Sequence, residues 1–483
     1  MPSQSVLAMA IVAVYLVSVG LIARRFGKLH DQSVAEFAVA SRSFKWYMVM
    51  FTVLATWIVG ATYTAWVGMS IVDGMLAQYA ALYGLGGLVV YYLIAPRIWS
   101  WGKAHNLYNL PDFIELRYGS KGLAIFIAIA GILLNFPWHI IAFKTFGYVA
   151  SALTGGAVPF NLGMTIVVLL IAGYVMWGGQ RTVVILDFYQ GIISVVVVLA
   201  GIVFVTYSLF GGFGPLLSRL ASEKPELLTI ADKPYWTCII LGGIIGSYCW
   251  LEIFNRIFVA ESVSEVRKVI VGAPFLMVLI FVMLVIMSMG GSLIAEVAAD
   301  PEAGFLTMFT MAGGPLLLAF AAIVIVAAEM SSIDSQLATN SVVVANNIIK
   351  PFKPGLTDRQ ILTICRISAL VFVLSALVVA MMELPMLVSI AIFTYENLVN
   401  LFPTIILGAL WTRGNKTAAV AGLSVGIPVT LYFTWNATLS QALFGSWTPG
   451  IIGFTLNTLI YVIISLASRP QPSTTELFQE LES

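Results

Sequence analysis

The sequence has little charge for its length. Only 10% of its 483 residues are Asp, Glu, Lys or Arg, and 60% are hydrophobic, whereas soluble domains carry about 25% charged residues. So little polar surface excludes a soluble protein, and the mean hydropathy of +0.97 indicates an integral membrane protein. The net charge of +1, without a basic block, argues against a nucleic-acid partner.

Cysteine and histidine are also scarce. The three cysteines, Cys238, Cys249 and Cys365, lie in apolar segments, so no disulfide framework is expected. The three histidines are scattered without metal-ligand spacing, and no glycine-rich phosphate loop with Lys followed by Ser or Thr is present. We therefore expect neither an enzyme nor a bound cofactor.

Long apolar runs fill the chain instead. A membrane helix needs about 20 apolar residues, so the sequence predicts an all-α integral membrane protein with about thirteen transmembrane helices. The predicted spans are residues 5–23, 45–70, 75–97, 122–152, 160–177, 183–210, 235–257, 270–297, 314–346, 360–382, 385–411, 416–436 and 449–468. Together they predict one transmembrane domain over residues 1–470, followed by a cytoplasmic tail over residues 471–483.

The distribution of Lys and Arg predicts the orientation. Loops after odd-numbered spans hold most of these residues, whereas loops after even-numbered spans hold only Arg219, Lys224 and Lys233. Because cytoplasmic loops are enriched in Lys and Arg, we expect the N-terminus outside the cytoplasm and the C-terminus inside. The first run is followed by Arg24 and Arg25, not by a small-residue cleavage site, which favours a retained helix.

Two spans are interrupted near their middles. Residues 54–68 read LATWIVGATYTAWVG, and residues 241–256 read LGGIIGSYCWLEIFNR. They begin two possible five-helix halves of opposite orientation, and paired interrupted helices indicate a transporter binding site. The alternative is that Gly and Thr only let neighbouring helices pack closely.

A polar stretch, AAEMSSIDSQ over residues 327–336, lies in an apolar span. At about 100° per residue, Ala328, Ser331, Ser332 and Ser335 share one arc of the helix, with Glu329 and Asp334 on either side of it. Serines in membrane helices often only bond to their own backbone, but acids there usually mark an ion site, a water-filled path or a buried pair. Hydroxyls facing an unwound helix would supply the oxygen ligands that sodium needs.

This stretch resembles the signature of the sodium:solute symporter family, which includes bacterial proline and sialic acid symporters and animal sodium/glucose cotransporters. FAVASRSFKWY, LPDFIELRYGSKG, GYVMWGGQRTVVILDFYQGII and FNRIFVAESVSEVRK are similar to further landmarks of that family. The resemblance covers about residues 5–470. It implies a LeuT-like fold with an extra helix over 5–23, two inverted five-helix repeats over 45–210 and 235–411, and extra helices over 416–468.

The resemblance also implies an ion site. Its sodium ligands would be carbonyls of the broken first core helix, with a carbonyl and two hydroxyls of the eighth: Ala55, Ile58, Ala328, Ser331 and Ser332. Asp187 matches an acid near the family's ion exit path, which some members use in a second sodium site, and Ser335 is its companion. The alternative is that Asp187 lies at a helix end near Arg181.

The solute site is expected between the two halves. The candidate lining residues are Trp57, Thr62, Lys144, Tyr248, Glu252, Tyr395, Glu396 and Asn397. Trp57 stands where proline symporters have an acid, which argues against proline. Lys144 could anchor a substrate carboxylate, pair with Asp187 or Glu329, or titrate in place of the ion; alternatively it snorkels to the membrane surface. Each aromatic residue could also simply pack or anchor a helix.

The sequence therefore predicts a plasma-membrane (bacterial inner-membrane) transporter. It would carry a small organic solute, such as an amino acid or a carboxylate, into the cytoplasm together with a sodium ion by alternating access, with membrane lipid as its surroundings. Proton-coupled symport on the same fold is one alternative. The other is a membrane sensor, which would need a separate signalling partner because only a short tail follows residue 470.

Overall fold

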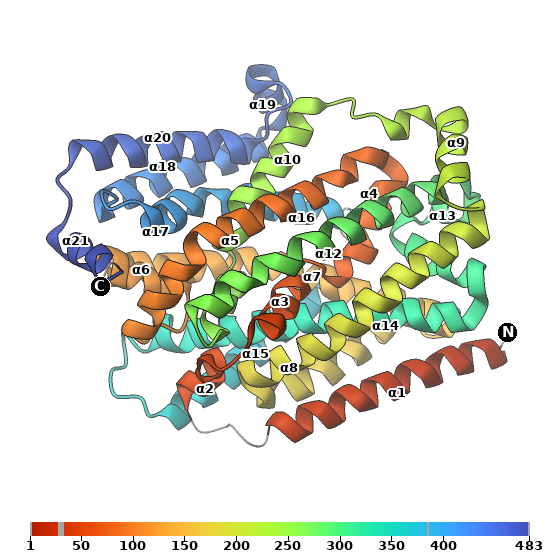
Figure 1. The fold of residues 1–483 in the computed structure, drawn as a ribbon, viewed down its shortest axis with the longest axis horizontal. Coiled ribbons are helices and arrows are strands. Elements are labelled where there is room, and N and C mark those ends of the chain that lie inside the picture. Colours follow the sequence, from red (N-terminus) through yellow and green to blue (C-terminus); the bar gives the residue numbers. More distant parts are fainter. Residues whose placement is uncertain (1, 28–32, 384–385, 482–483) are drawn as a thin grey trace.

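The computed structural model describes residues 2–27, 33–383 and 386–481, and it is a bundle of helices (Figure 1). Within these residues no β-strand forms; one isolated bridge joins Phe44 to Ala260. A continuous cluster of buried apolar side chains runs through the bundle from Ala8 to Leu477. The predicted all-α fold is confirmed.

The described residues of the first half, 2–27 and 33–223, form nine α-helices. They are α1 (Pro2–Gly27), α2 (Val34–Val39), α3 (Trp46–Ala55), α4 (Ala65–Asp73), α5 (Tyr79–Ala104), α6 (Leu110–Tyr118), α7 (Lys121–Thr154), α8 (Phe160–Phe210) and α9 (Phe213–Glu223). Short 3-10 helices flank α4, with η2 (Gly60–Tyr63) before it and η3 (Gly74–Gln78) after it.

The described part of the second half, up to residue 481 and without residues 384–385, forms twelve α-helices. They are α10 (Lys233–Gly246), α11 (Leu251–Asn255), α12 (Val263–Met289), α13 (Ala295–Ala299), α14 (Gly304–Val343), α15 (Asp358–Ala380), α16 (Leu387–Leu398), α17 (Gly408–Leu410), α18 (Lys416–Trp435), α19 (Ala437–Phe444), α20 (Pro449–Ala467) and α21 (Pro472–Gln479). Two short 3-10 helices lie between these elements, with η5 (Ser247–Cys249) between α10 and α11 and η7 (Gly290–Leu293) between α12 and α13.

The count of thirteen membrane helices is not confirmed. In the described residues, ten helices are long and apolar enough to cross a membrane, or eleven if the bent pair over residues 233–259 counts as one. Neither α3, which ends after 10 residues, nor the stretch Phe160–Leu169 qualifies alone. The predicted span 45–70 does not count as one membrane helix, because it is broken after Ala55 and neither piece is long enough by itself.

Helix α8 accounts for two predicted spans, 160–177 and 183–210. The Phe160 ring lies close to Gly147 near the end of α7, and the Phe210 ring lies close to Gly290 in η7. Between these ends, Arg181 forms an ion pair with Glu36 of α2. Figure 1 shows α2 at the opposite end of the bundle from α13, which directly follows η7. Helix α8 therefore runs along the bundle to the end that carries α2 and then back to the end that carries η7.

Both predicted interruptions are present. Helix α3 ends at Ala55, four non-helical residues follow, and η2 begins at Gly60. In the second half, Trp250 is extended (φ −70°, ψ 134°) between η5 and α11, and the chain bends there by 54°. Both breaks lie inside the bundle, where backbone carbonyls freed from helical hydrogen bonding become available as ligands.

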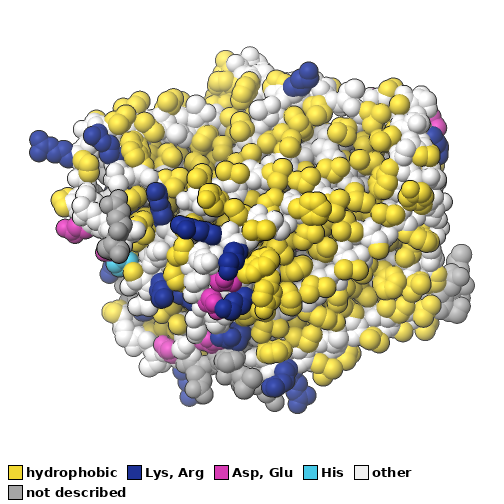
Figure 2. All heavy atoms as spheres, in the orientation of Figure 1, with side chains coloured by type: hydrophobic (Ala, Val, Ile, Leu, Met, Phe, Trp, Pro, Cys, Tyr) yellow, Lys and Arg dark blue, Asp and Glu magenta, His cyan; other side chains and the backbone are white. Residues whose placement is uncertain are grey.

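The two termini lie at opposite ends of the bundle (Figure 1). The residues after 470 are not a loose tail, because α21 packs beside α6: the Trp101 indole nitrogen donates to the Leu477 carbonyl at 2.8 Å, and Arg117 donates to the Thr474 hydroxyl at 3.0 Å. In Figure 2, hydrophobic side chains cover most of the visible face, and Lys and Arg gather toward the end that carries α2, α6 and α21.

Candidate functional site

The hydroxyl face of α14 packs against the break that follows α3. Ser332 Oγ lies 2.9 Å from the carbonyl oxygen of Ala328 and 3.3 Å from that of Ala55. Ser331 Oγ donates to the same Ala328 carbonyl at 3.0 Å. The amides of Trp57 and Ile58 both turn back to the Leu54 carbonyl, which closes the end of α3. The predicted back-bonding of the serines and their contact with the broken helix therefore occur together.

A small cavity lies at this junction. Ala55 and Ile58 border it from the break, and Ala328 and Ser331 border it from α14. It measures about 30 Å³, enough for a water-sized particle. The structure thus brings the five predicted sodium residues to one place, with Ser332 linking the two elements. The oxygens they offer are carbonyls and hydroxyls, which suit a hard monovalent cation.

Glu329 lies over the same break, against η2. Its side chain is buried, its carboxylate contacts the amide of Ala61 and the hydroxyl of Thr145, and its Oε1 has no hydrogen-bond partner among the described residues. A Cβ added to Gly60 would lie 2.0 Å from the Glu329 Cγ. Gly60 is therefore the residue that makes room for this acid.

Asp187 belongs to a second polar cluster. Its Oδ2 accepts a hydrogen bond from Arg256 Nη2 at 2.8 Å and another from the Thr52 hydroxyl, and both charged side chains are fully buried. The same Arg256 nitrogen also bonds to the Ser335 hydroxyl. Asp187 therefore has a buried guanidinium as its partner, and Arg181, which could have placed it at a helix end, pairs with Glu36 instead.

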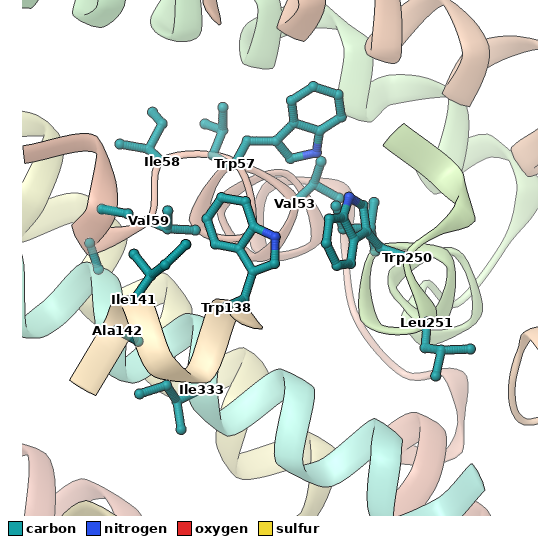
Figure 3. Close-up of a cluster of buried hydrophobic side chains, with 14 of the residues drawn as sticks. Val53, Trp57, Ile58, Val59, Trp138, Ile141, Ala142, Trp250, Leu251 and Ile333 are labelled. Carbon is teal, nitrogen blue, oxygen red and sulfur yellow. The ribbon is translucent and has the colours of Figure 1, made fainter. Parts of the chain in front are cut away.

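A central cavity lies between the two breaks. Its lining residues are Thr56, Trp57, Val59, Trp66, Tyr83, Trp138, Trp250, Glu252, Ile253, Gln336 and Tyr395. Of the predicted solute residues, Trp57, Glu252 and Tyr395 are among them. Figure 3 shows Trp57, Trp138 and Trp250 converging from three separate elements, with Trp57 and Trp250 each carried by a break.

Glu252 is held in place by amides. Its Oε2 accepts from Asn135 Nδ2 at 2.9 Å, and its Oε1 accepts from Gln336 Nε2 at 3.4 Å. The residue is 4% exposed. A buried carboxylate with neutral donors keeps an unbalanced charge, and such a charge is costly unless a ligand or a proton neutralises it.

The other predicted solute residues lie elsewhere. Tyr248 is buried beside Tyr91 and Trp57, with ring centroids 5.5 and 6.3 Å apart. Thr62 is buried in η2. Glu396 faces a separate cavity of about 20 Å³ between α10, α16 and α20. Asn397 bonds to the Phe393 carbonyl of its own helix.

Lys144 does not line either cavity. Its Nζ donates to the backbone carbonyl of Met382 at 3.0 Å, in the connection between α15 and α16, and this contact is exposed. A lysine that ends at an exposed loop carbonyl fits the snorkelling interpretation of its sequence position. Nothing in this arrangement brings its ammonium to Asp187 or Glu329.

Sequence reasoning missed several residues of these sites. Arg256 stood in the quoted segment FNRIFVAESVSEVRK, and a basic residue so close to Glu252 in an apolar span was a usable signal. Trp138 and Gln336 gave no such signal, because a lone aromatic or amide in a span does not reveal which face it occupies. Their positions depend on how α7 and α14 pack.

Comparisons with known proteins identify the family of this chain. A model of the family described as "Sodium:solute symporter family" matches residues 37–426. The chain belongs to the sodium:solute symporter family. Two relatives from Bacillus subtilis (strain 168) are an uncharacterized symporter, YodF, and the high-affinity proline transporter PutP. YodF is 25% identical over 95% of this chain and 93% of its own length, and PutP is 27% identical over 82% and 85%.

Among solved structures, a Na⁺-coupled sialic acid symporter in a substrate-bound outward-open state has a TM-score of 0.79. It is 18% identical and covers 96% of this chain and 98% of its own. This likeness shows the fold of the family member described here, which is LeuT-like with two inverted five-helix repeats. The chain is a multi-pass membrane transporter and not an enzyme. The boundaries 45–210 and 235–411 of the two repeats stay a prediction.

Proposed function

We propose that this symporter-family protein carries a small organic solute into the cytoplasm together with a sodium ion, by alternating access. The contact between Ser332 and the Ala55 carbonyl carries the proposal, because it joins α14 to the broken helix beside a cavity of ion size. Neutral oxygens leave the ion its charge. The membrane potential then contributes about 2.3 kcal/mol per 100 mV to inward movement.

The break after α3 borders both the ion cavity and the central cavity, and it would couple binding at the two sites. Ala55 and Ile58 border the ion cavity, and Trp57, which lies between them, borders the central cavity. An ion that fixes the two carbonyls also fixes the backbone on either side of the Trp57 ring. Binding of either ligand therefore favours the backbone arrangement that the other needs, which is positive coupling between two sites.

The distribution of Lys and Arg supports an orientation of the protein in the membrane. Lys and Arg gather at the end of the bundle that carries α6 and α21 (Figure 2), and cytoplasmic loops are enriched in these residues. We assign that end to the cytoplasm, with the C-terminus inside and the N-terminus outside. A plasma membrane with an inward sodium gradient is the setting in which such a carrier accumulates solute.

The test uses purified protein in sealed vesicles. A candidate solute is supplied outside, and its uptake is measured with an inward sodium gradient, with an inward proton gradient, and with neither. We expect accumulation only with the sodium gradient, and a faster rate when the interior is negative. Equal uptake under all three conditions would exclude ion-coupled symport.

Proton coupling on the same fold is a second candidate, and one observation favours it. Glu329 places a buried carboxylate against η2, with one oxygen that lacks a partner within the described part of the chain. A proton could neutralise it as an ion would. Uptake driven by a proton gradient without sodium, and abolished by Glu329→Gln, would establish this candidate in place of sodium coupling.

A further inference from the structure

The wall of the central cavity is aromatic and acidic. Six of its lining residues are Trp or Tyr, namely Trp57, Trp66, Tyr83, Trp138, Trp250 and Tyr395, and one is the acid Glu252. Among the described residues that line it, none is Lys, Arg or His. This composition distinguishes the cavity from a site for an anionic solute, which would require a basic partner.

The rings form a connected enclosure. Trp57 stacks on Tyr83 at 5.6 Å between centroids, and Trp66 stacks on Trp138 at 6.0 Å. Trp250 meets the edges of Trp138 and Tyr395 at 5.8 and 5.5 Å. These residues come from both breaks and from α4, α5, α7 and α16, so the enclosure depends on the tertiary fold and not on one helix.

The acid in this enclosure forms no ion pair or hydrogen bond with a cationic side chain among the described residues, although the charge of Arg256 acts on it from nearby. The hydrogen bonds to Glu252 come from the side-chain amides of Asn135 and Gln336. Arg256 follows one turn later, but its guanidinium is bonded to Asp187 and Ser335. An ionised carboxylate buried in this way is best balanced by a positive charge that arrives with the ligand.

We propose that the solute is a small organic cation, an ammonium that carries methyl or methylene groups. The faces of Trp57, Trp138 and Trp250 would supply cation–π attraction, for which a cation must lie within about 6 Å of a ring centroid, and Glu252 would supply the counter-charge. This inference rests on the proposed symport function. It narrows the predicted solute class, because a carboxylate solute finds no basic group here and Lys144 is bonded to the Met382 carbonyl.

The enclosure is contracted in this structure. The cavity measures about 20 Å³, which is room for a water-sized particle and not for a methylated ammonium. The rings must separate when a ligand enters. Trp57 is carried by the non-helical residues between Ala55 and Gly60, so its ring stands on the least regular element of the wall. Movement there reaches the two carbonyls of the ion site directly.

The test compares two molecules of one shape. Choline and 3,3-dimethylbutan-1-ol differ in that a charged nitrogen replaces a neutral carbon. We expect choline to raise the melting temperature of the purified full chain in sodium buffer, with an apparent affinity at least about tenfold tighter than that of the neutral alcohol. Equal effects of the two molecules, no effect of choline, or a stronger effect of proline or of a simple carboxylate would overturn the proposal.

Variants then locate the effect. Glu252→Gln should reduce the preference for choline over the alcohol to near one, whereas Asp112→Asn, which neutralises a partly buried carboxylate outside the cavity, should keep it. Trp138→Phe should retain part of the preference for choline, and Trp138→Leu should lose it. Trp101→Phe, outside the cavity, should leave the preference unchanged. Loss of preference in the Asp112 or Trp101 variants to the same degree would assign the effect to general destabilisation and overturn the site.

Uptake separates this proposal from the function on which it rests. If choline binds selectively but no ion gradient drives its uptake, the solute class stands and symport fails. If a sodium gradient drives uptake of a different solute and choline neither binds nor competes, symport stands and the solute class fails.

Discussion

Ser332 Oγ of α14 lies 3.3 Å from the carbonyl oxygen of Ala55, the last residue of α3, across 277 positions of sequence. The same hydroxyl lies 2.9 Å from the Ala328 carbonyl on its own helix. A hydroxyl has one proton, so it can donate to only one of these oxygens at a time. An ion that binds between them would take the place of that shared hydrogen bond.

Ser332→Ala should weaken sodium binding. Loss of a buried ligand oxygen costs about 1–3 kcal/mol, which corresponds to roughly 5- to 150-fold in apparent sodium affinity. The measurement is the sodium concentration for half-maximal uptake. Ser341→Ala is the matched control, because Ser341 is also buried on α14 but bonds to the Ala338 carbonyl and contacts Cys365, and it does not border the ion cavity. An unchanged sodium dependence in Ser332→Ala would contradict the assignment.

Arg256→Met should strongly destabilise the protein. Asp187 and Arg256 are both fully buried, and removal of one partner of a buried ion pair costs about 3–5 kcal/mol. The double variant Asp187→Asn/Arg256→Met should recover part of this loss, since Asp187 no longer leaves an unpaired charge, while Glu252 and Asp334 still lose the attraction of Arg256. The thermal melting temperature in detergent or nanodiscs reports both effects.

Arg219→Gln provides the comparison for that experiment. Arg219 and Glu223 form an exposed pair one helical turn apart, and such pairs contribute about 0.3–0.5 kcal/mol. This variant should melt close to the unmodified protein. If Arg256→Met melts no earlier than Arg219→Gln, the buried pair does not stabilise the fold.

Gly60→Ala should disturb the break itself. The new Cβ would overlap the Glu329 side chain, and overpacking of this kind costs about 1–3 kcal/mol. Adding Glu329→Ala should restore stability in part, because the two positions are in contact and their effects are not additive. Gly122→Ala on α7, where a Cβ meets nothing within 4 Å, should be close to neutral. Additive losses in the double variant would show that the two residues do not meet.

Asp112 should make stability depend on pH. It lies on α6, outside the membrane-spanning helices, and burial raises the pKa of its carboxyl above the ordinary value of 3.8, although hydrogen bonds from Asn347 and from the Tyr108 amide oppose the shift. The folded protein therefore holds this proton more tightly than the unfolded chain does. Its contribution to stability is greatest at low pH and falls as the pH rises from 3.8 through the folded pKa.

Asp112→Asn should remove that fall. The melting temperature of the variant relative to the unmodified protein should rise as the pH increases from acid and then level off above the folded pKa of Asp112. Glu223→Gln is the control and should retain the fall, because this exposed side chain bonds to Arg219 and does not contact Asp112. Parallel curves for Asp112→Asn and the unmodified protein would mean that Asp112 does not carry the effect.

The apolar runs and the two interruptions could be predicted because each depends on local sequence. A run of about 20 apolar residues is long enough for a crossing, and Gly and Thr at residues 54–68 weaken a helix at that point. The hydroxyl face of α14 could be predicted from its spacing for the same reason. The predicted count of thirteen crossings is not confirmed, because α3 ends at Ala55 and is too short to count as a crossing by its length.

The partners of the buried charges required the tertiary structure. Asp187 and Arg256 are 69 residues apart, and their contact depends on how α8 packs beside the second broken helix. The position of Lys144 in an apolar span left a buried role and snorkelling both open, and only the structure shows that its side chain reaches the Met382 carbonyl at the surface. Sequence position limits where a Cα lies in the membrane, but not where four flexible bonds place an ammonium.

The single turn of backbone that holds Trp57 between Ala55 and Ile58 limits how this scaffold can evolve. Replacement of that indole perturbs the carbonyls on both sides of it. Under the proposed function, a homologue that changes its solute specificity through residue 57 therefore also changes its affinity for the coupling ion. The rings of Trp138 and Tyr395 stand on α7 and α16, away from those carbonyls. Substitutions that change solute specificity in homologues should therefore be found mainly on α7 and α16, whereas the sequence of the turn should change little.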